Sequence, residues 1–401
     1  MKLYIYDIEI FNNLLIIVFY SIVDDEYLVF EYSELKDNKG IDQRKELLEF
    51  ITSNSGKLVL IGYNSYSFDD QLLYYIIKHP KASVIDYKNI ANQIIKSKWN
   101  LFKDNEIYPK YIRLGIDTMK INNYGIGSAK TTSLKMLGFN FRESDVEDLP
   151  LKHDSKVNTR PNIDKIIEYC KNDCKKTFKH FNITKPLIKY RQEFGKTFGF
   201  GLTLVNTTEV QFAKAVLGKV LGKKMNLTPY EFSKLRTYYK EISIADVLIP
   251  KKFPEKYGNI FDFELDINKD LYSFYLNTKL EIDPKKQGNL IKFDGAISKT
   301  ITYDNGLTTT IGVGGIHGIV PSGIYKSDDE YVIRDFDYGS YYPHLIYIFG
   351  FEPKHLIEGL LGKQLVETWF HERNNIFKKD THYELNYAIK IIMNLCYGGL
   401  K

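Results

Sequence analysis

The stretch "KLYIYDIEIFNNLLIIVFYSI" (residues 2–22) decides the fold of the first part of the chain. Two runs rich in Ile, Val, Phe and Tyr, residues 2–9 and 14–22, flank the sequence "FNN". Short apolar runs joined by turn residues predict a hairpin of buried strands. Asp7 and Glu9 stand two residues apart in the first run, so their carboxylates project from one face of the expected strand.

Helices are interleaved with the strands that follow the hairpin, which predicts a mixed α/β domain. We expect this domain to end near residue 182. The expected strands are 26–33, 57–64 and 111–121, and the expected helices are 44–53, 68–79 and 162–181. We expect the last of these helices to begin at an Asn162 cap that follows Pro161. Its apolar face is expected to carry Ile163, Ile166, Ile167 and Cys170.

Further acidic residues fall at the ends of these elements. Asp69 opens a helix just after a strand, and Tyr169 and Asp173 are four residues apart on the last helix, hence on one face. Each signal has an ordinary structural explanation, namely a solvated strand face for Asp7 and Glu9, a helix cap for Asp69 and a surface position for Asp173. Together, four carboxylates and a tyrosine can hold two Mg²⁺ ions for phosphodiester hydrolysis.

The order Asp-x-Glu, Asn-x-x-x-Phe-Asp and Tyr-x-x-x-Asp resembles the three Exo motifs of the DEDD 3′–5′ exonuclease superfamily, tyrosine subtype. The resemblance covers residues 1 to about 182 and implies a ribonuclease H-like domain. It implies that Tyr169 orients the attacking water. The metal ligands that it implies, for two Mg²⁺ or Mn²⁺ ions, are Asp7, Glu9, Asp69 and Asp173.

The same resemblance implies contacts with single-stranded DNA. Asn64 and Phe68 would hold the 3′ end of a primer. Ser133 and Leu134, in "SLKML", resemble a Ser/Thr-Leu-x-x-apolar element that grips single-stranded DNA in polymerase-linked members. Ile10 stands where many members have Thr, which is a departure from the pattern at one contact with the terminal nucleotide.

A second constellation follows near the end of the sequence. In "RDFDYGSYYP", Asp337 ends an expected strand (330–337), and a helix is expected from about Ser340. In "KIIMNLCYG", Lys390, Asn394 and Tyr397 fall at i, i+4 and i+7, so they share one helix face. The structural alternatives are a capped turn and a solvated stripe. The residues expected to face away from this polar row are Ile389, Ile392 and Met393.

These two patterns resemble motifs A and B of family B DNA polymerases of the compact phage type. The resemblance implies that Asp337 is a catalytic metal ligand and that Gly314 and Gly315, in "VGGIHG", contact DNA. Another helix, expected from about residue 363 to 377, comes before motif B. The nucleotide-binding residues implied by the resemblance are Ser340, Tyr341, Tyr342, Arg373, Lys378, Lys390, Asn394 and Tyr397.

The expected organisation is an exonuclease domain (1–182), a connecting region with the palm entry (183–325), and a partial palm with fingers helices (326–401). Family B polymerases also need a Tyr-x-Asp-Thr-Asp motif, which this sequence lacks. We therefore expect the N-terminal part of such a polymerase, with proofreading activity. Polymerisation, with two further metal ions, would require a C-terminal segment or second polypeptide that carries motif C. The expected partners are primer-template DNA, single-stranded 3′ ends and dNTPs.

Two other functions are compatible with the same residues. One is a stand-alone DEDD nuclease, on DNA or RNA, whose C-terminal half binds substrate. The other is a non-catalytic subunit that binds primer-template DNA. Nuclease activity and dNTP binding distinguish the three.

Composition is compatible with all three functions. The chain has 401 residues, 44% of them hydrophobic and 26% charged, and its net charge of +5 permits a polyanionic partner without requiring one. The N-terminus lacks the features of a signal peptide, and no apolar run reaches the ~18 residues of a membrane span. We expect a cytoplasmic protein, in the host cell if it is encoded by a phage, with no membrane partner. Its cysteines, Cys170, Cys174 and Cys396, are expected to be reduced thiols.

Overall fold

In the computed structural model the chain forms two compact units. Unit 1 comprises Met1–Val216 and His382–Ala388, and unit 2 comprises Leu217–Thr381 and Ile389–Lys401. The residues that the structure describes are 1–35, 40–97, 101–102, 112–122, 132–142, 147–235, 241–243, 279–281, 298–304, 306–312, 315–349, 352 and 356–398.

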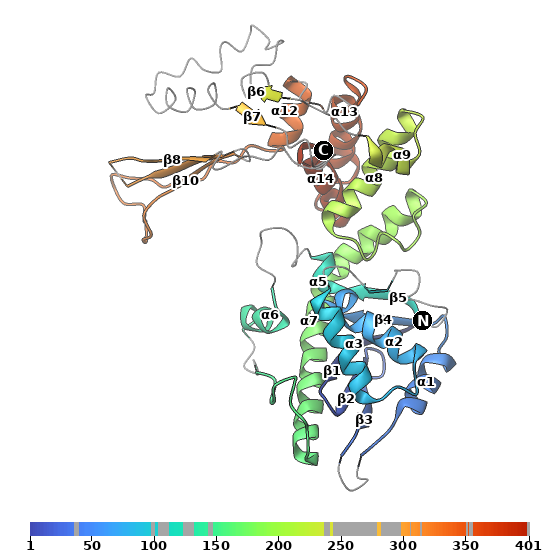
Figure 1. Cartoon of the computed structure of the whole chain (residues 1–401). Helices are drawn as coiled ribbons and strands as arrows, with labels where there is room; N and C mark the ends of the chain where they lie inside the picture. Colours follow the sequence, from blue (N-terminus) through green and yellow to red (C-terminus); the bar gives the residue numbers. More distant parts are fainter. Residues whose placement is uncertain are drawn as a thin grey trace. The chain divides into compact units, whose positions relative to one another are not determined.

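Unit 1 is built on a five-stranded mixed sheet with the strand order β3-β2-β1-β4-β5 (Figure 1). β2 runs antiparallel to both β1 and β3, whereas β1, β4 and β5 are parallel. The strands are β1 (Lys2–Ile10), β2 (Leu14–Ser21), β3 (Glu26–Ser33), β4 (Leu58–Gly62) and β5 (Ile112–Asp117). The expected hairpin and the mixed α/β class are therefore confirmed.

Helices cover both faces of this sheet, so β1 separates two hydrophobic cores. Tyr6 and Ile8 pack in one core with side chains of α1, α2 and α3, whereas Ile5 and Phe11 pack in the other with α7. The helical segments of unit 1 are α1 (Arg44–Ser53), η2 (Ser65–Ser67), α2 (Asp69–Lys78), α3 (Val84–Lys96), α5 (Thr118–Ile121), α6 (Leu134–Asn140) and α7 (Arg160–Thr197), with the start of α8 (Glu209–Lys224).

The long helix α7 begins earlier than we expected. Thr159 is its N-cap, and Pro161 lies in the first turn, where the missing N–H group costs no helical hydrogen bond. Asn162 is therefore inside the helix, and the expected cap at this residue is wrong. The helix runs without a break through residue 182. The expected apolar face is confirmed, because all of its members are buried: Ile163, Ile166, Ile167 and Cys170.

Unit 2 contains short strands and several helices. β8, β9 and β10 form an antiparallel sheet, and β6 pairs with β7. The bounds of its strands are β6 (Glu241–Ser243), β7 (Lys279–Glu281), β8 (Ser298–Thr302), β9 (Thr308–Gly312) and β10 (Gly315–Ile319). The helical segments are α9 (Pro229–Lys234), α12 (Tyr341–Phe349), α13 (Leu360–Lys363), η4 (Gln364–Phe370), η5 (Glu372–Ile376) and α14 (Tyr383–Gly398), whose first residues belong to unit 1.

Two expected elements of unit 2 differ from the structure. Residues 330–337 do not form a strand and pair with none of the described strands, and Phe336 is 82% exposed. A single strand is not stable without a partner, so an apolar sequence alone does not produce one. The helix expected over residues 363–377 is present as far as Ile376, but it consists mainly of two π-helical segments, η4 and η5.

The described residues bear on two expectations from composition. All three cysteines are buried and free. Of the helices that the structure describes, none has the length and low charge that crossing a lipid bilayer would require.

Candidate metal centre

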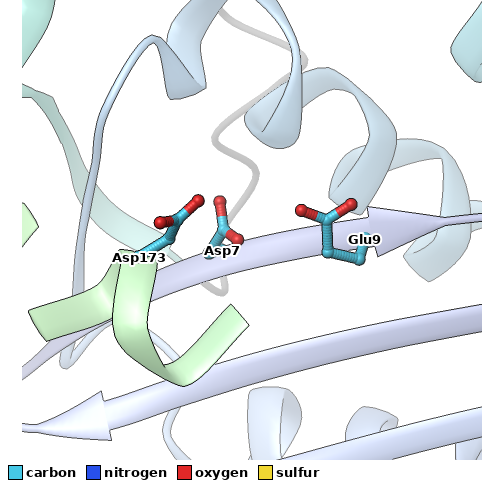
Figure 2. A group of neighbouring side chains, drawn as sticks. All are labelled: Asp7, Glu9 and Asp173. Atoms are coloured by element: carbon cyan, nitrogen blue, oxygen red, sulfur yellow. The ribbon is translucent and has the colours of Figure 1, made fainter. Parts of the chain in front are cut away.

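Three carboxylates converge at the centre of unit 1. Asp7 and Glu9 extend from the same face of β1, and Asp173 reaches Asp7 from α7 (Figure 2). One oxygen atom from each of the three side chains lies within 4.8 Å of the other two. Carboxylate oxygens are the ligands that Mg²⁺ and Mn²⁺ prefer, so this cluster could hold a metal ion.

The alternation of β1 explains why these acids point inward. Odd-numbered side chains of the strand face α7, and Ile5 and Phe11 are completely buried there. Asp7 and Glu9 occupy the two positions between them, where further apolar residues would complete the core. Two negative charges in a buried position repel each other and lose their hydration. A bound cation or proton is needed to offset this cost.

Asp69, at the start of α2, lies close enough to Asp7 and Glu9 for their charges to affect its carboxyl group. Its side chain is buried, and burial together with the charges of Asp7 and Asp70 raises its pKa well above the usual range. Its oxygen atoms are not part of the 4.8 Å cluster of Asp7, Glu9 and Asp173. The structure therefore brings three of the four metal ligands predicted for this centre into direct proximity, with the fourth beside them.

The electrostatic state of the centre reflects first the burial of its carboxylates and second the crowding of their negative charges. Burial and, secondarily, the charge of Asp173 raise the pKa of Asp7 to about 7. Burial and the neighbouring Asp7 raise the pKa of Glu9 well above its usual range. The Cys170 thiol donates a hydrogen bond to Oδ2 of Asp7 at 3.2 Å, which opposes part of this rise. A bound divalent cation would favour the ionised carboxylates.

This crowding predicts a specific dependence of stability on pH. A carboxyl whose pKa is higher in the folded than in the unfolded protein loses its contribution to stability as the pH rises from about 4 to about 7. We therefore expect Mg²⁺ to raise the melting temperature by roughly 5 °C or more at pH 8, and by less at pH 5. Thermal melts of wild type and Asp7→Asn at both pH values, with and without Mg²⁺, measure this shift in melting temperature. An equal Mg²⁺ effect at both pH values in wild type would contradict it.

Tyr169 lies one helical turn before Asp173 and is partly buried. Burial, the charges of Asp173 and Glu9, and a hydrogen bond with Asp173 all raise the pKa of its hydroxyl group. The phenol therefore stays protonated at neutral pH. It can donate a hydrogen bond or orient a water molecule, but it does not act as a base.

Basic groups that the sequence did not point to lie around the acids. On α7, Lys176 pairs with Asp173 at 2.9 Å. From α3, Lys88 approaches Asp154 at 3.4 Å, and its positive charge lowers the pKa of Glu9. The interval of three residues between Asp173 and Lys176 is a local signal that could have revealed the first pair. Lys88 has no such signal, because its partners are distant in sequence.

The turn between β4 and α2 carries the residues that we expected to hold a DNA end. Asn64 is exposed and has a left-handed backbone conformation (φ 59°), and Phe68 is partly buried at the N-cap of α2. Asp117, at the end of β5, accepts hydrogen bonds from the backbone N–H groups of Asn64 and Tyr66 at 3.0 and 3.1 Å. The turn that precedes Asp69 is therefore held by a buried carboxylate that our sequence reasoning did not single out.

Ser133 and Leu134 stand at the start of α6. Ser133 is the N-cap, and its hydroxyl accepts a hydrogen bond from the N–H group of Met136 at 3.1 Å. The hydroxyl of Tyr63 donates a hydrogen bond to the carbonyl of Thr132, so the start of α6 is linked to the end of β4. Ser133 is exposed and Leu134 is partly exposed.

The residues implied by motif A lie around the start of α12. Asp337 is exposed in the irregular segment before this helix, and Tyr341 and Tyr342 are exposed. Arg373, from η5, contacts the hydroxyl of Ser340 at 3.4 Å. Part of the predicted nucleotide-binding set therefore comes together. Among the described residues, Asp337 belongs to no cluster of three potential metal ligands.

The residues implied by motif B lie on α14, and Lys378, expected on the preceding helix, is exposed after η5. Lys390 and Asn394 are exposed, whereas Ile389, Ile392 and Met393 are buried, as the helical periodicity predicted. Gly315 is the first residue of β10. Gly314 lies outside the described residues, as does the side chain of Tyr397.

No protein-family model matches the sequence, and the searches of curated proteins and of solved structures found no match. The chemistry of the centre therefore follows from its own geometry. Three carboxylates within 4.8 Å, a fourth beside them and a protonated tyrosine suit a site for a hard divalent cation.

Proposed function

We propose that unit 1 is a 3′–5′ exonuclease domain that requires Mg²⁺ or Mn²⁺ and degrades single-stranded DNA ends. The observation that carries this proposal is the convergence of Asp7, Glu9 and Asp173 within 4.8 Å, with Tyr169 on the same helix as Asp173. The five-stranded mixed sheet with helices on both faces supports the ribonuclease H-like fold that the sequence resemblance implied.

The side chains of the centre have two kinds of role in the proposed reaction, as metal ligands and as a group that orients water. Asp7, Glu9, Asp69 and Asp173 would hold the metal ions, and bound ions would supply a Lewis acid for the phosphodiester and a lower pKa for the attacking water. Because the hydroxyl of Tyr169 is protonated and close to Asp173, it is suited to orient that water for in-line attack.

The turn before α2 suits the reacting end of the substrate. Asn64 is exposed, Phe68 is partly exposed, and Asp69 follows Phe68 directly. An amide side chain and an aromatic ring are groups that hydrogen-bond and stack on a nucleotide. We infer that a DNA 3′ end enters over this turn, so that its last phosphodiester lies against the carboxylates.

We further propose that unit 2 carries part of the nucleotide-binding site of a family B DNA polymerase. The contact between Arg373 and Ser340 and the exposure of Lys390 and Asn394 support this role. Guanidinium and ammonium groups are the usual ligands of a triphosphate. Binding of a dNTP to wild type, weakened at least about tenfold in Lys390→Ala, is the expected result. Equal binding to both would favour a stand-alone nuclease.

The direct test of the exonuclease uses the whole chain and a single-stranded DNA labelled at its 5′ end. With Mg²⁺, the labelled strand should shorten one nucleotide at a time from the 3′ end, and chelation of the metal should stop the reaction. A parallel RNA substrate reports the sugar preference. A chain that binds the DNA but leaves it intact with both Mg²⁺ and Mn²⁺ would instead be a non-catalytic subunit.

Tyr169→Phe provides a narrower prediction. It removes only the hydroxyl, so we expect the rate of nucleotide release to fall by about ten- to a hundredfold. Mn²⁺ affinity should stay within about threefold, because the carboxylates remain. Single-turnover kinetics and Mn²⁺ titration measure the two effects. Tyr230→Phe, at a position that is 71% exposed, is the matched control and should leave both unchanged. A Tyr169→Phe chain with the wild-type rate would remove Tyr169 from the reaction.

A further inference from the structure

We propose that Lys176 is a built-in counter-ion of the metal centre. In the metal-free protein its ammonium group pairs with the carboxylate of Asp173. A divalent cation must displace this ammonium group in order to bind the same carboxylate. This inference rests on the metal centre of the proposed exonuclease and adds a residue that limits how tightly the centre binds its ion.

The contact between the two side chains is close and shielded from water. Nζ of Lys176 lies 2.9 Å from Oδ1 of Asp173, and the two side chains are 6% and 16% exposed. Lysine is seldom buried to this extent unless it is paired with an acid. The same helix contains a second pair with the same spacing, Lys171 and Glu168 at 2.7 Å, but those side chains are 25% and 63% exposed. The first pair is therefore distinguished by its burial at the acidic centre.

The ammonium group of Lys176 acts on more than one member of the centre. Its positive charge lowers the pKa of Asp7, and it lies 6.0 Å from the centre of the Tyr169 ring. Lys88, the other buried lysine near the acids, is held differently. Its Nζ lies 3.5 Å from the carbonyl oxygen of Ile10 and pairs with Asp154, which is not part of the cluster. Lys176 is thus the lysine whose described ion pair is made with a predicted metal ligand.

A metal ion and this ammonium group compete for the same carboxylate. Both are cations, and a metal bound to Asp173 would lie within a few ångströms of Nζ, where their repulsion is strong in a partly buried site. Lys176 must therefore move away from Asp173 as the metal enters. Without metal, the same ammonium group relieves part of the repulsion among the carboxylates, so it stabilises the metal-free fold and weakens metal binding.

The test is a titration of the whole chain with Mn²⁺, in which free Mn²⁺ is followed by electron paramagnetic resonance. Lys176→Met, which keeps the length and apolar stem of the side chain, should lower the dissociation constant for Mn²⁺ by at least about tenfold. Lys176→Arg retains the positive charge and should bind no more tightly than wild type. Lys171→Met removes the exposed cation of the second pair and should change the constant by less than about twofold. An unchanged or weaker affinity in Lys176→Met would overturn the proposal.

A measurement on wild type keeps the test valid if Lys176→Met fails to fold. Acetylation of lysines, followed by mass spectrometry of peptides, reports how accessible each ammonium group is. Saturating Mn²⁺ should increase acetylation of Lys176 several-fold and leave Lys171 unchanged. Asp7→Asn should reduce the increase at Lys176. If Mn²⁺ left the acetylation of Lys176 unaltered or reduced it, the competition would be refuted.

The outcomes separate this inference from the proposed function. If Lys176→Met binds Mn²⁺ more tightly and wild type degrades no DNA, the counter-ion role stands and the exonuclease assignment fails. If wild type degrades DNA and Lys176→Met does not bind Mn²⁺ more tightly, the exonuclease stands and the counter-ion role fails.

Discussion

Asp7→Asn is expected to slow the Mg²⁺-dependent release of nucleotides from a DNA 3′ end by at least about a thousandfold. The substitution keeps the size of the side chain and removes one negative charge from the centre of the cluster. Asp7 is the residue best placed to contact a shared metal, because Glu9 and Asp173 both approach it within 4.8 Å. Asp173→Asn should have an effect of similar size. Single-turnover assays at saturating DNA measure both.

The matched control is Glu168→Gln, which neutralises an exposed carboxylate on the same helix as Asp173. It should retain the wild-type rate. Asp7→Asn should also melt at the same temperature as wild type or higher in metal-free buffer at pH 8, since it removes charge repulsion. An inactive and less stable Asp7→Asn would point to misfolding. Rapid degradation by Asp7→Asn would exclude Asp7 from the reaction.

Asp117→Ala is expected to destabilise unit 1 by about 3 kcal/mol or more. The carboxylate of Asp117 is buried, and it also accepts hydrogen bonds from the N–H groups of Met119 and Lys120 at 3.0 and 3.1 Å. The N–H groups of Asn64 and Tyr66 bond to the same carboxylate. Removal of the carboxylate therefore leaves four backbone N–H groups without this acceptor. The melting temperature should fall by roughly 10 °C. Exonuclease activity should fall as well, because the turn before Asp69 loses its anchor.

Asp117→Asn separates the geometry of this anchor from its charge. The N–H groups of Asn64, Met119 and Lys120 all bond to Oδ1, whereas that of Tyr66 bonds to Oδ2. An asparagine oriented with its oxygen at the Oδ1 position keeps three of the four bonds, so its loss of stability should be less than half that of alanine. Calorimetric melts compare the two variants. A melting temperature within about 2 °C of wild type in Asp117→Ala would show that the turn needs no such anchor.

The parts of unit 1 that could be predicted from the sequence depend on short periodicities. The period of two along β1 placed Asp7 and Glu9 on one face, and Figure 2 shows them side by side there. The helical period placed Tyr169 and Asp173, four residues apart, on one face of the expected last helix. These features depend on neighbours within a few residues, and hence on local geometry.

Other parts could not be predicted, because they depend on partners that are remote in the chain. An apolar run becomes a strand only where another strand pairs with it, and residues 330–337 pair with none of the described strands. Asp117 follows the turn at Asn64 by 53 residues, so its role as an anchor is visible only once β4 and β5 lie side by side. The start of α7 was misplaced by a smaller error, since Pro161 is compatible with the first helical turn as well as with the position before it.

By itself, the sequence determined which side chains share a face: the acidic pair on β1, Tyr169 with Asp173 on α7, and Lys390 with Asn394 on α14. Backbone geometry repeats every two residues in a strand and every 3.6 in a helix, so these relations need no tertiary contact. Only the tertiary structure decided that Asp173 meets Asp7, that Cys170 bonds to Asp7 and that the charge of Lys176 reaches Asp7. These contacts exist because hydrophobic packing presses α7 against the sheet, which brings the charges of distant segments within a few ångströms of each other.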